Sequence, residues 1–324
     1  MKRLVSGIKP TGQLHIGNYI GAIAQYVEQQ NEYDSFLFVA DYHALTTQPQ
    51  PEQLTEETLQ VAALLIACGV DPKKATLFVQ SAVPEHAELA VIMSNFTTMG
   101  QLNRMTQFKE KSSQYGQLAG LFTYPVLMAA DVAVYDAEVV PVGDDQVQHL
   151  ELAREIIRSI NKHAGSELFK EPKPLLSHAP RIMALNDPTK KMSKSVAGSA
   201  IGLLDDEGTI TRTIKRAVTD SDPNSNKKSP ALENLFAIMK TVSEHETYLR
   251  FEKMHSDGKL QYSELKEQLI EDTLAFLAPI QKSYQSLRRD DEALKKMLTN
   301  GNATARQAAQ AKLAVVKKSL GLLG

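Results

Sequence analysis

LVSGIKPTGQLHIGN, residues 4–18, spans the transition from the first predicted strand to the first predicted helix. LVSGI at 4–8 is a short apolar run, which is typical of a buried strand. The helical pattern that follows covers residues 16–30, and one of its faces carries Ile16, Ile20, Ile23 and Val27. A helix start presents unpaired N–H groups and the positive end of its dipole, so this turn suits a phosphate group.

The same alternation of strand and helix continues to about residue 200. Further predicted strands lie at 36–40, 76–80, 138–142 and 181–185, and helical patterns lie at 51–68, 85–99, 121–134 and from about residue 144. Strands that alternate with helices form a mostly parallel sheet, whose ligands bind at the carboxyl ends of the strands. We therefore predict a nucleotide-binding α/β domain over residues 1–200.

Residues 201–324 contain no further strand pattern. Helical patterns cover 205–218, 230–242, 262–287, 291–299 and 303–320, and the polar stretch TDSDPNSNKKS at 219–229 is a predicted loop. We therefore expect an all-helical domain after the α/β domain.

The composition is that of an ordinary globular protein, with 324 residues, 43% of them hydrophobic and 23% charged. This length is sufficient for two domains. The net charge of −2 gives no general nucleic-acid signal, and no apolar run reaches the roughly 18 residues of a membrane span. The single cysteine, Cys68, lies in an apolar run and fits a buried side chain in a reducing compartment, so the expected location is the cytoplasm.

TGQLHIGN at 11–18 is the first candidate for phosphate chemistry. Gly17 lets a ligand approach the backbone closely, and His15 and Asn18 place two side-chain donors at the helix start. A turn at Gly12 with His15 as a surface cap is an equally good interpretation of this segment alone.

KMSKS at 191–195 is the second candidate. Lys191 and Lys194 are flexible point charges beside Ser193, which suits them to phosphate charge that moves during a reaction. A solvated basic loop is the alternative interpretation.

Together, HIGN and KMSKS resemble the two signature sequences of class I aminoacyl-tRNA synthetases. The resemblance implies that His15, Asn18, Lys191 and Lys194 are catalytic. It also implies an ATP site made of Lys9, Pro10, Thr11, Gly17, Asn18, Gly143, Asp144, Asp145, Ile182, Lys191, Met192, Ser193, Lys194 and Ser195. In this set Gly143 and the two aspartates would hold the ribose, and the Ile182 backbone would meet the adenine. Asp144 or Asp145 also fits a plain helix cap.

Eight further segments resemble bacterial tryptophanyl-tRNA synthetases in particular. They are SGIKPTG (6–12), DYHALT (41–46), ATLFVQS-VPEHAEL (75–89), RMTQFKEK (104–111), LFTYPVLMAADV (121–132), VPVGDDQ-QHLE (140–151), RIMALNDPTKKMSKS (181–195) and AVTDSD (217–222). Lys109 and Lys111 in the fourth segment match lysines near the phosphates or the tRNA acceptor end, although a solvated helix face explains them equally simply.

This second resemblance implies a Rossmann-type fold for residues 1–200 and a helical anticodon-binding domain at 201–324, whose last helix packs back on the catalytic domain. The implied reaction joins L-tryptophan to ATP, which carries Mg²⁺, releases pyrophosphate and then loads tRNA(Trp). A homodimer is also implied, and no metal held by protein ligands or membrane partner is expected.

Asp131 lies in the apolar context MAADVAVY, where an unpaired carboxylate would be costly. The resemblance implies that it accepts the indole N–H of tryptophan, and a pocket built around a required hydrogen bond discriminates strongly. An ion-paired or capping aspartate is the alternative. The other tryptophan-binding residues implied by the resemblance are Val5, His43, Tyr124, Met128, Val140, Val142 and Gln146.

Two residues depart from the family pattern, since Lys9 stands where glutamine is usual and Val5 where phenylalanine is common. A tyrosine-specific enzyme of the same fold would be expected to have tyrosine at position 5. A non-catalytic paralogue that binds amino acid or tRNA is a second alternative, against which the intact His15, Gly17 and Asn18 argue.

Overall fold

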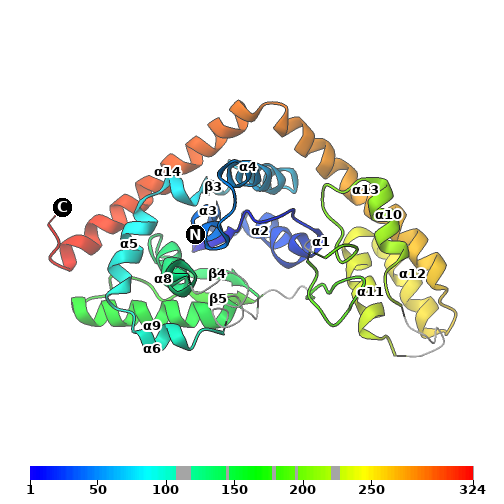
Figure 1. Ribbon diagram of the computed structural model, residues 1–324, viewed down its shortest axis with the longest axis horizontal. Helices are drawn as coiled ribbons and strands as arrows, with labels where there is room; N and C mark the ends of the chain where they lie inside the picture. The colour runs from blue at the N-terminus through cyan, green and yellow to red at the C-terminus, as the bar shows by residue number, and fades with distance from the viewer. Residues whose placement is uncertain (107–117, 144–145, 177–179, 194–195, 220–226, 324) are drawn as a thin grey trace. The chain divides into compact units, whose positions relative to one another are not determined.

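The protein is described from a computed structural model, which covers residues 1–106, 118–143, 146–176, 180–193, 196–219 and 227–323 (Figure 1). The chain divides into two compact units that are interleaved along the sequence. The first unit consists of Met1–Thr11, Tyr26–Ser177 and Asp290–Gly324, and the second of Gly12–Gln25 and His178–Arg289. The division of the chain into functional domains near residue 200 therefore stays a prediction.

The first unit is built on a parallel sheet of five strands in the order β3-β2-β1-β4-β5. The strands are β1 (Arg3–Ile8), β2 (Asp34–Val39), β3 (Thr76–Val79), β4 (Val139–Val142) and β5 (Lys173–Leu176). Val5 of the central strand pairs with Phe36 of β2, and Leu4 pairs with Val139 of β4. The predicted Rossmann-type α/β architecture is confirmed.

The predicted fifth strand is wrong. Residues 181–185 make only one isolated antiparallel bridge, between Met183 and Lys191, and β5 lies earlier in the chain. The run is apolar because Ile182 and Leu185 are buried within the second unit. The true strand was missed because its sequence, KPLL, is short, half polar and largely exposed at the sheet edge.

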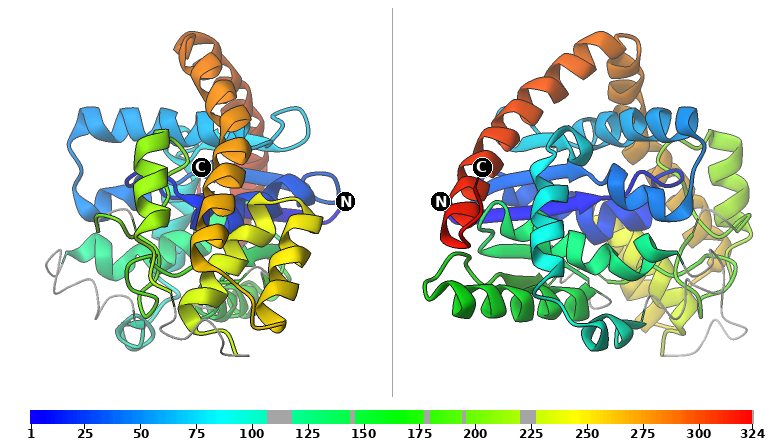
Figure 2. Two further views of the ribbon diagram at one scale, coloured as in Figure 1. Left: turned by 90° about the vertical axis from the view of Figure 1, so that its right-hand side faces the viewer. Right: turned by 60° about the vertical axis from the view of Figure 1, so that its left-hand side comes forward.

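Helices cover both faces of the sheet. Figures 1 and 2 show α4 (Pro51–Ala67) on one side and α8 (Ala119–Ala133) with α9 (Val147–Ala164) on the other. This unit also contains α3 (Asp41–Ala44), α5 (Glu85–Ser94) and α6 (Met99–Asn103). Most of the second half of α8 is buried, so this helix carries Asp131 into the core.

The last helix, α14 (Asp291–Ser319), is continuous where two helices were predicted. Gly301 and Asn302 are residue types typical of a helix end, but in the structure both lie inside α14 and contact β3. A Cβ at Gly301 would lie 1.8 Å from the Leu77 carbonyl oxygen, so only glycine permits this approach. The Val79 N–H donates to Asn302 Oδ1 at 2.9 Å. The helix thereby covers the edge strand of the sheet.

The second unit is helical from residue 207 onward, as predicted. It contains α10 (Glu207–Lys215), α11 (Pro230–Val242), α12 (His245–Ser256) and α13 (Tyr262–Arg288), of which α12 was not predicted. Asp206 and Ser229 cap the starts of α10 and α11. Across the ranges that the structure describes, no helix combines the length and the apolar character needed to cross a membrane.

The predicted helix over 16–30 is present but not uniform. It starts as α1 (Ile16–Asn18), continues as a π-helical turn over Tyr19–Ile23 and ends as α2 (Ala24–Gln29). Irregularities of this kind are common at functional sites.

Candidate active site

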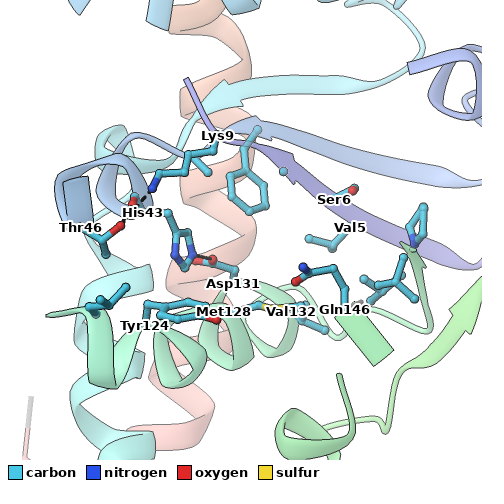
Figure 3. Close-up of a pocket in the computed structure, with 17 residues that line it drawn as sticks. Val5, Ser6, Lys9, His43, Thr46, Tyr124, Met128, Asp131, Val132 and Gln146 are labelled. Atoms are coloured by element: carbon cyan, nitrogen blue, oxygen red, sulfur yellow. Dashed lines mark hydrogen bonds and ion pairs between the residues drawn. The ribbon is translucent and has the colours of Figure 1, made fainter. Parts of the chain in front are cut away.

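A cavity of about 330 Å³ opens in the first unit beside β1, β4, α3 and α8 (Figure 3). All eight residues that the sequence assigned to tryptophan line it: Val5, His43, Tyr124, Met128, Asp131, Val140, Val142 and Gln146. Lys9 and Thr46 also line it, and the Lys9 ammonium donates to the Thr46 hydroxyl at 3.0 Å. These residues come from five separate parts of the chain, so the fold alone brings them together. Their role in binding tryptophan stays a prediction.

Asp131 is the polar centre of this cavity wall, with a side chain only 2% exposed. Its Oδ2 lies 2.7 Å from His43 Nε2, and its Oδ1 lies 2.7 Å from both His86 Nδ1 and Gln80 Nε2. A carboxylate accepts about four hydrogen bonds, and three are in place. The alternative prediction, an ion-paired aspartate, also agrees with the structure, because His43 and His86 lie within ion-pair distance of the same carboxylate.

The environment keeps this carboxylate charged. Burial by itself would raise the pKa of Asp131, but the charge and hydrogen bond of His43 and the bond from His86 outweigh it. The net effect lowers the pKa of Asp131 to about 2. The cavity thus contains a permanent negative acceptor at neutral pH.

Tyr124 and Gln146 lie on the cavity wall, where the resemblance places the amino-acid end of the substrate. The Tyr124 hydroxyl lies 2.5 Å from Nε2 of the buried His149, which orients the phenol ring. A fixed tyrosine oxygen beside a cavity is a suitable acceptor for an ammonium group.

The HIGN segment belongs to the second unit and is held by backbone bonds. Ile16 N–H donates to the Ile201 carbonyl at 2.9 Å, and His15 bridges Gly202. The Asn18 Oδ1 accepts from the His15 N–H at 3.0 Å, which stabilises the helix start.

The described part of KMSKS, residues 191–193, lies in the same unit as HIGN, and its Met192 lies close to Gly17. A Cβ at Gly17 would lie 3.0 Å from His15 Nδ1 and 3.4 Å from Met192 Sδ, so the glycine keeps both contacts close. Met192 is buried, and its N–H donates to the Ile182 carbonyl at 3.2 Å. Lys191 is exposed. The two signature sequences are therefore adjacent, although 173 positions separate Asn18 from Lys191 (191 minus 18).

Several predicted residues cannot be placed. Asp144, Asp145, Lys194 and Ser195 lie outside the described residues, as do Lys109 and Lys111. Pro10, Thr11 and Gly143 are described and belong to the first unit, whereas His15, Gly17, Asn18, Ile182 and Ser193 belong to the second. Among residues with a described placement, no group of His, Cys, Asp and Glu could hold a metal ion.

Sequence reasoning missed Gln80, His86 and Tyr135. Gln80 and His86 bond to Asp131 Oδ1, and the Tyr135 hydroxyl bonds to His86. Both Gln80 and His86 are fully buried, which is unusual for such polar side chains. The only signal in the sequence was that Gln80 and His86 fall in the segment ATLFVQS-VPEHAEL, which carries the resemblance without pointing to either residue.

The model of the family "tRNA synthetases class I (W and Y)" matches residues 1–278 of this chain. The chain therefore belongs to the class I tRNA synthetases of the tryptophan and tyrosine type. Its similarity to individual members is greatest, among the relatives compared, to enzymes of the tryptophan branch, as the sequence predicted.

Two relatives named tryptophan–tRNA ligase align over their whole length. The protein of Caldanaerobacter subterraneus subsp. tengcongensis is 44% identical, covering 100% of this chain and 99% of the relative. That of Porphyromonas gingivalis is 41% identical, covering 99% of each. Among solved structures, tryptophanyl-tRNA synthetase from Campylobacter jejuni complexed with ADP and tryptophan has a TM-score of 0.87 and 36% identity, covering 99% of this chain and 100% of that one. The Mycoplasma pneumoniae enzyme has a TM-score of 0.89 and 35% identity, covering 100% and 98%.

Proposed function

We propose that this chain is a tryptophan–tRNA ligase, which activates L-tryptophan with ATP and transfers it to tRNA(Trp). The observation that carries the choice of amino acid is Asp131, a buried charged acceptor that lines the cavity beside the apolar side chains of Val5, Met128 and Val140. Indole is a large apolar group with a single N–H donor, so its chemistry matches this wall. Full-length similarity to tryptophan–tRNA ligases supports the same reaction.

The apolar walls favour indole over phenol. Val5, Val140 and Met128 offer van der Waals contact and no strong hydrogen-bonding group. Tyr124 and Gln146 are proposed to hold the ammonium end, so that Asp131 discriminates at the opposite, aromatic end. Because an unpaired buried acceptor costs free energy, an amino acid without the N–H is rejected.

The first step needs no protein nucleophile. The tryptophan carboxylate oxygen attacks the α-phosphorus of ATP, the P–O bond to the β-phosphate breaks, and pyrophosphate leaves with its electron pair. Catalysis then consists of positioning and charge stabilisation. We assign phosphate contacts to Asn18 and the helix start at Gly17, and pyrophosphate contacts to Lys191, Ser193 and Lys194. Gly143 with Asp144 and Asp145 is assigned to the ribose, and the Ile182 backbone to the adenine.

The remaining partners are proposals of the same kind. Mg²⁺ is expected to enter with ATP on its phosphates, as it does in most nucleotide sites. tRNA(Trp) is the acceptor of the second step, a homodimer is the expected assembly, and the cytoplasm is the expected compartment. Burial raises the pKa of the Cys68 thiol to about 12, so this buried cysteine is a packing residue and not a nucleophile.

ATP–pyrophosphate exchange with each of the twenty amino acids tests the proposal. Exchange is expected with tryptophan alone, followed by acylation of a tRNA(Trp) transcript. Exchange with tyrosine would support the tyrosine-specific alternative, and no exchange with any amino acid would support the non-catalytic one. Lys194→Ala should lower the exchange rate strongly with little change in tryptophan affinity, and a wild-type rate would contradict the role of KMSKS.

A further inference from the structure

A chain of buried hydrogen bonds leads away from the cavity behind Asp131. His86 on α5 lies with Nδ1 2.7 Å from Asp131 Oδ1 and Nε2 2.8 Å from the Tyr135 hydroxyl. His86 is 0% exposed and Tyr135 is 1% exposed, and neither lines the cavity. These two polar groups are thus buried in the core and do not line the cavity.

The direction of each bond follows from the chemistry of the groups. An ionised carboxylate can only accept, so His86 Nδ1 carries a proton and donates. In the neutral ring Nε2 is then an acceptor, and the Tyr135 hydroxyl donates to it. Burial and the nearby charge of Asp131 raise the pKa of Tyr135, so the phenol keeps its proton. The Tyr135 ring stacks on the Phe36 ring, with 4.6 Å between the ring centroids.

The two oxygens of Asp131 are not equivalent. Oδ1 accepts from His86 and Gln80, which are both fully buried and do not line the cavity. Among the described residues, Oδ2 accepts from His43 alone, which lines the cavity together with Asp131 (Figure 3). Oδ2 therefore has one more acceptor direction than the bonds of the described residues use, and it is the oxygen bonded to the cavity-lining His43.

We propose that His86, oriented by Tyr135, is a positioning residue for tryptophan selection, because it holds Asp131 Oδ1 and so presents Oδ2 to the indole N–H. The inference rests on the proposed function. Without His86, Oδ1 keeps only the bond from Gln80, so the carboxylate is held less firmly about its Cβ–Cγ bond and its open acceptor direction is less well fixed. His86 thus orients the Asp131 carboxylate and does not contact the substrate itself.

A pair of substrates separates this role from a purely structural one. L-tryptophan carries the N–H, whereas its benzothiophene analogue, with sulfur in place of the indole N–H, has nearly the same shape and no donor. In Tyr135→Phe we expect KM for tryptophan to rise about tenfold, the size expected of a weakened hydrogen bond to a charged group. The kcat for tryptophan and both constants for the analogue should stay within about twofold, so the preference for tryptophan falls about tenfold.

Substitutions of His86 give the rescue. His86→Leu removes the donor to Oδ1 and should lower the preference at least as much as Tyr135→Phe. His86→Asn restores an amide N–H near the position of Nδ1 and should recover part of the preference. If His86→Leu does not fold, Tyr135→Phe and His86→Asn decide the question.

Phe36→Leu is the matched control, because it removes the stacking on Tyr135 without removing any hydrogen bond of the chain. It should lower the melting temperature and leave the preference unchanged. A lower melting temperature with an unchanged preference in Tyr135→Phe would overturn the inference alone, as would an unchanged preference in His86→Leu if that variant folds. Absence of tryptophan-dependent exchange in the wild type would overturn the proposed function and the inference together.

Discussion

The cavity around Asp131 and the pair of signature segments are held together in opposite ways. In the cavity, side chains from α3, α5 and the 3₁₀ turn Gln80–Ala82 converge on one carboxylate, and those of Gln80 and His86 are fully buried. In the signature segments the backbone makes the bonds, through the bridges at His15 and Met183, while the Lys191 side chain is exposed. Each arrangement is described within its own unit.

The difference reflects what each site must recognise. Selecting one amino acid requires an acceptor whose direction is fixed before the substrate arrives, and buried side-chain bonds provide that. Stabilising phosphate charge as it moves requires cations that can follow it, and an exposed lysine on a backbone-held segment can do so. In the proposed reaction, the fixed Asp131 carboxylate would select the amino acid, and the exposed Lys191 would follow the phosphate charge.

Replacing Asp131 should break the cavity most severely. Asp131→Asn removes the charge and places an amide against donors from His43, His86 and Gln80, so one donor loses its partner. We expect kcat/KM for tryptophan to fall on the order of 100-fold, as for other buried charged partners. Tryptophan-dependent exchange measures it, and ATP affinity should not change. A fall in ATP affinity of similar size would show that the cavity does not act on the amino acid alone.

Replacing Lys191 should affect the other site in a different parameter. Lys191→Ala is expected to lower kcat for exchange about 30-fold, because the departing pyrophosphate loses an ionic contact that is stronger in the transition state than with bound ATP. KM for tryptophan should stay within about twofold. A large rise in KM for tryptophan with an unchanged kcat would mean that Lys191 acts on amino-acid binding and not on the phosphate charge.

The pH dependence of stability sharpens the same contrast. The pKa of Asp131 is about 2 in the folded protein against an ordinary value of 3.8, so the charged carboxylate stabilises the fold at neutral pH. This contribution is complete above about pH 5 and is lost as the pH falls towards 2. Urea unfolding should show about 1 kcal/mol of loss between pH 5 and pH 3 in the wild type that Asp131→Asn lacks. Equal losses in both proteins would assign the acid sensitivity to other groups.

The smallest effect is expected for Lys190, the neighbour of Lys191. Its side chain is 76% exposed, and its ammonium pairs with Asp187 Oδ2 at 3.0 Å. Since exposed ion pairs contribute about 0–1 kcal/mol, Lys190→Ala should change exchange by less than about threefold. Measured beside Lys191→Ala, it tests whether position in the segment or positive charge alone matters.

Much of the fold could be predicted from the sequence because it depends on local apolar patterns. Four strands of the sheet were predicted within two residues of their bounds, since each is an apolar run in the core. The edge strand β5 and the continuity of α14 could not, because KPLL is too short and too exposed to form an apolar run typical of a buried strand, and Gly301 is explained only by its contact with β3.

The candidate site divides along the same line. The cavity residues and signature segments were found by resemblance, and the structure brings the former into one cavity. Gln80 and His86 could not be found, because their meaning lies in contacts 51 and 45 positions away along the chain. A tertiary hydrogen-bond network leaves no period in the sequence.

The contact between α14 and β3 also determines when the first unit can be completed. Ribosomes make the chain from its amino end, so β3 is synthesised more than 200 positions before the helix that covers it: Asn302 is 223 positions from Val79. Until that helix emerges, the outer strand presents unpaired N–H and C=O groups to its surroundings. The sheet beside the cavity is therefore finished after synthesis of nearly the whole chain, and until then its open edge can pair with strands of other chains.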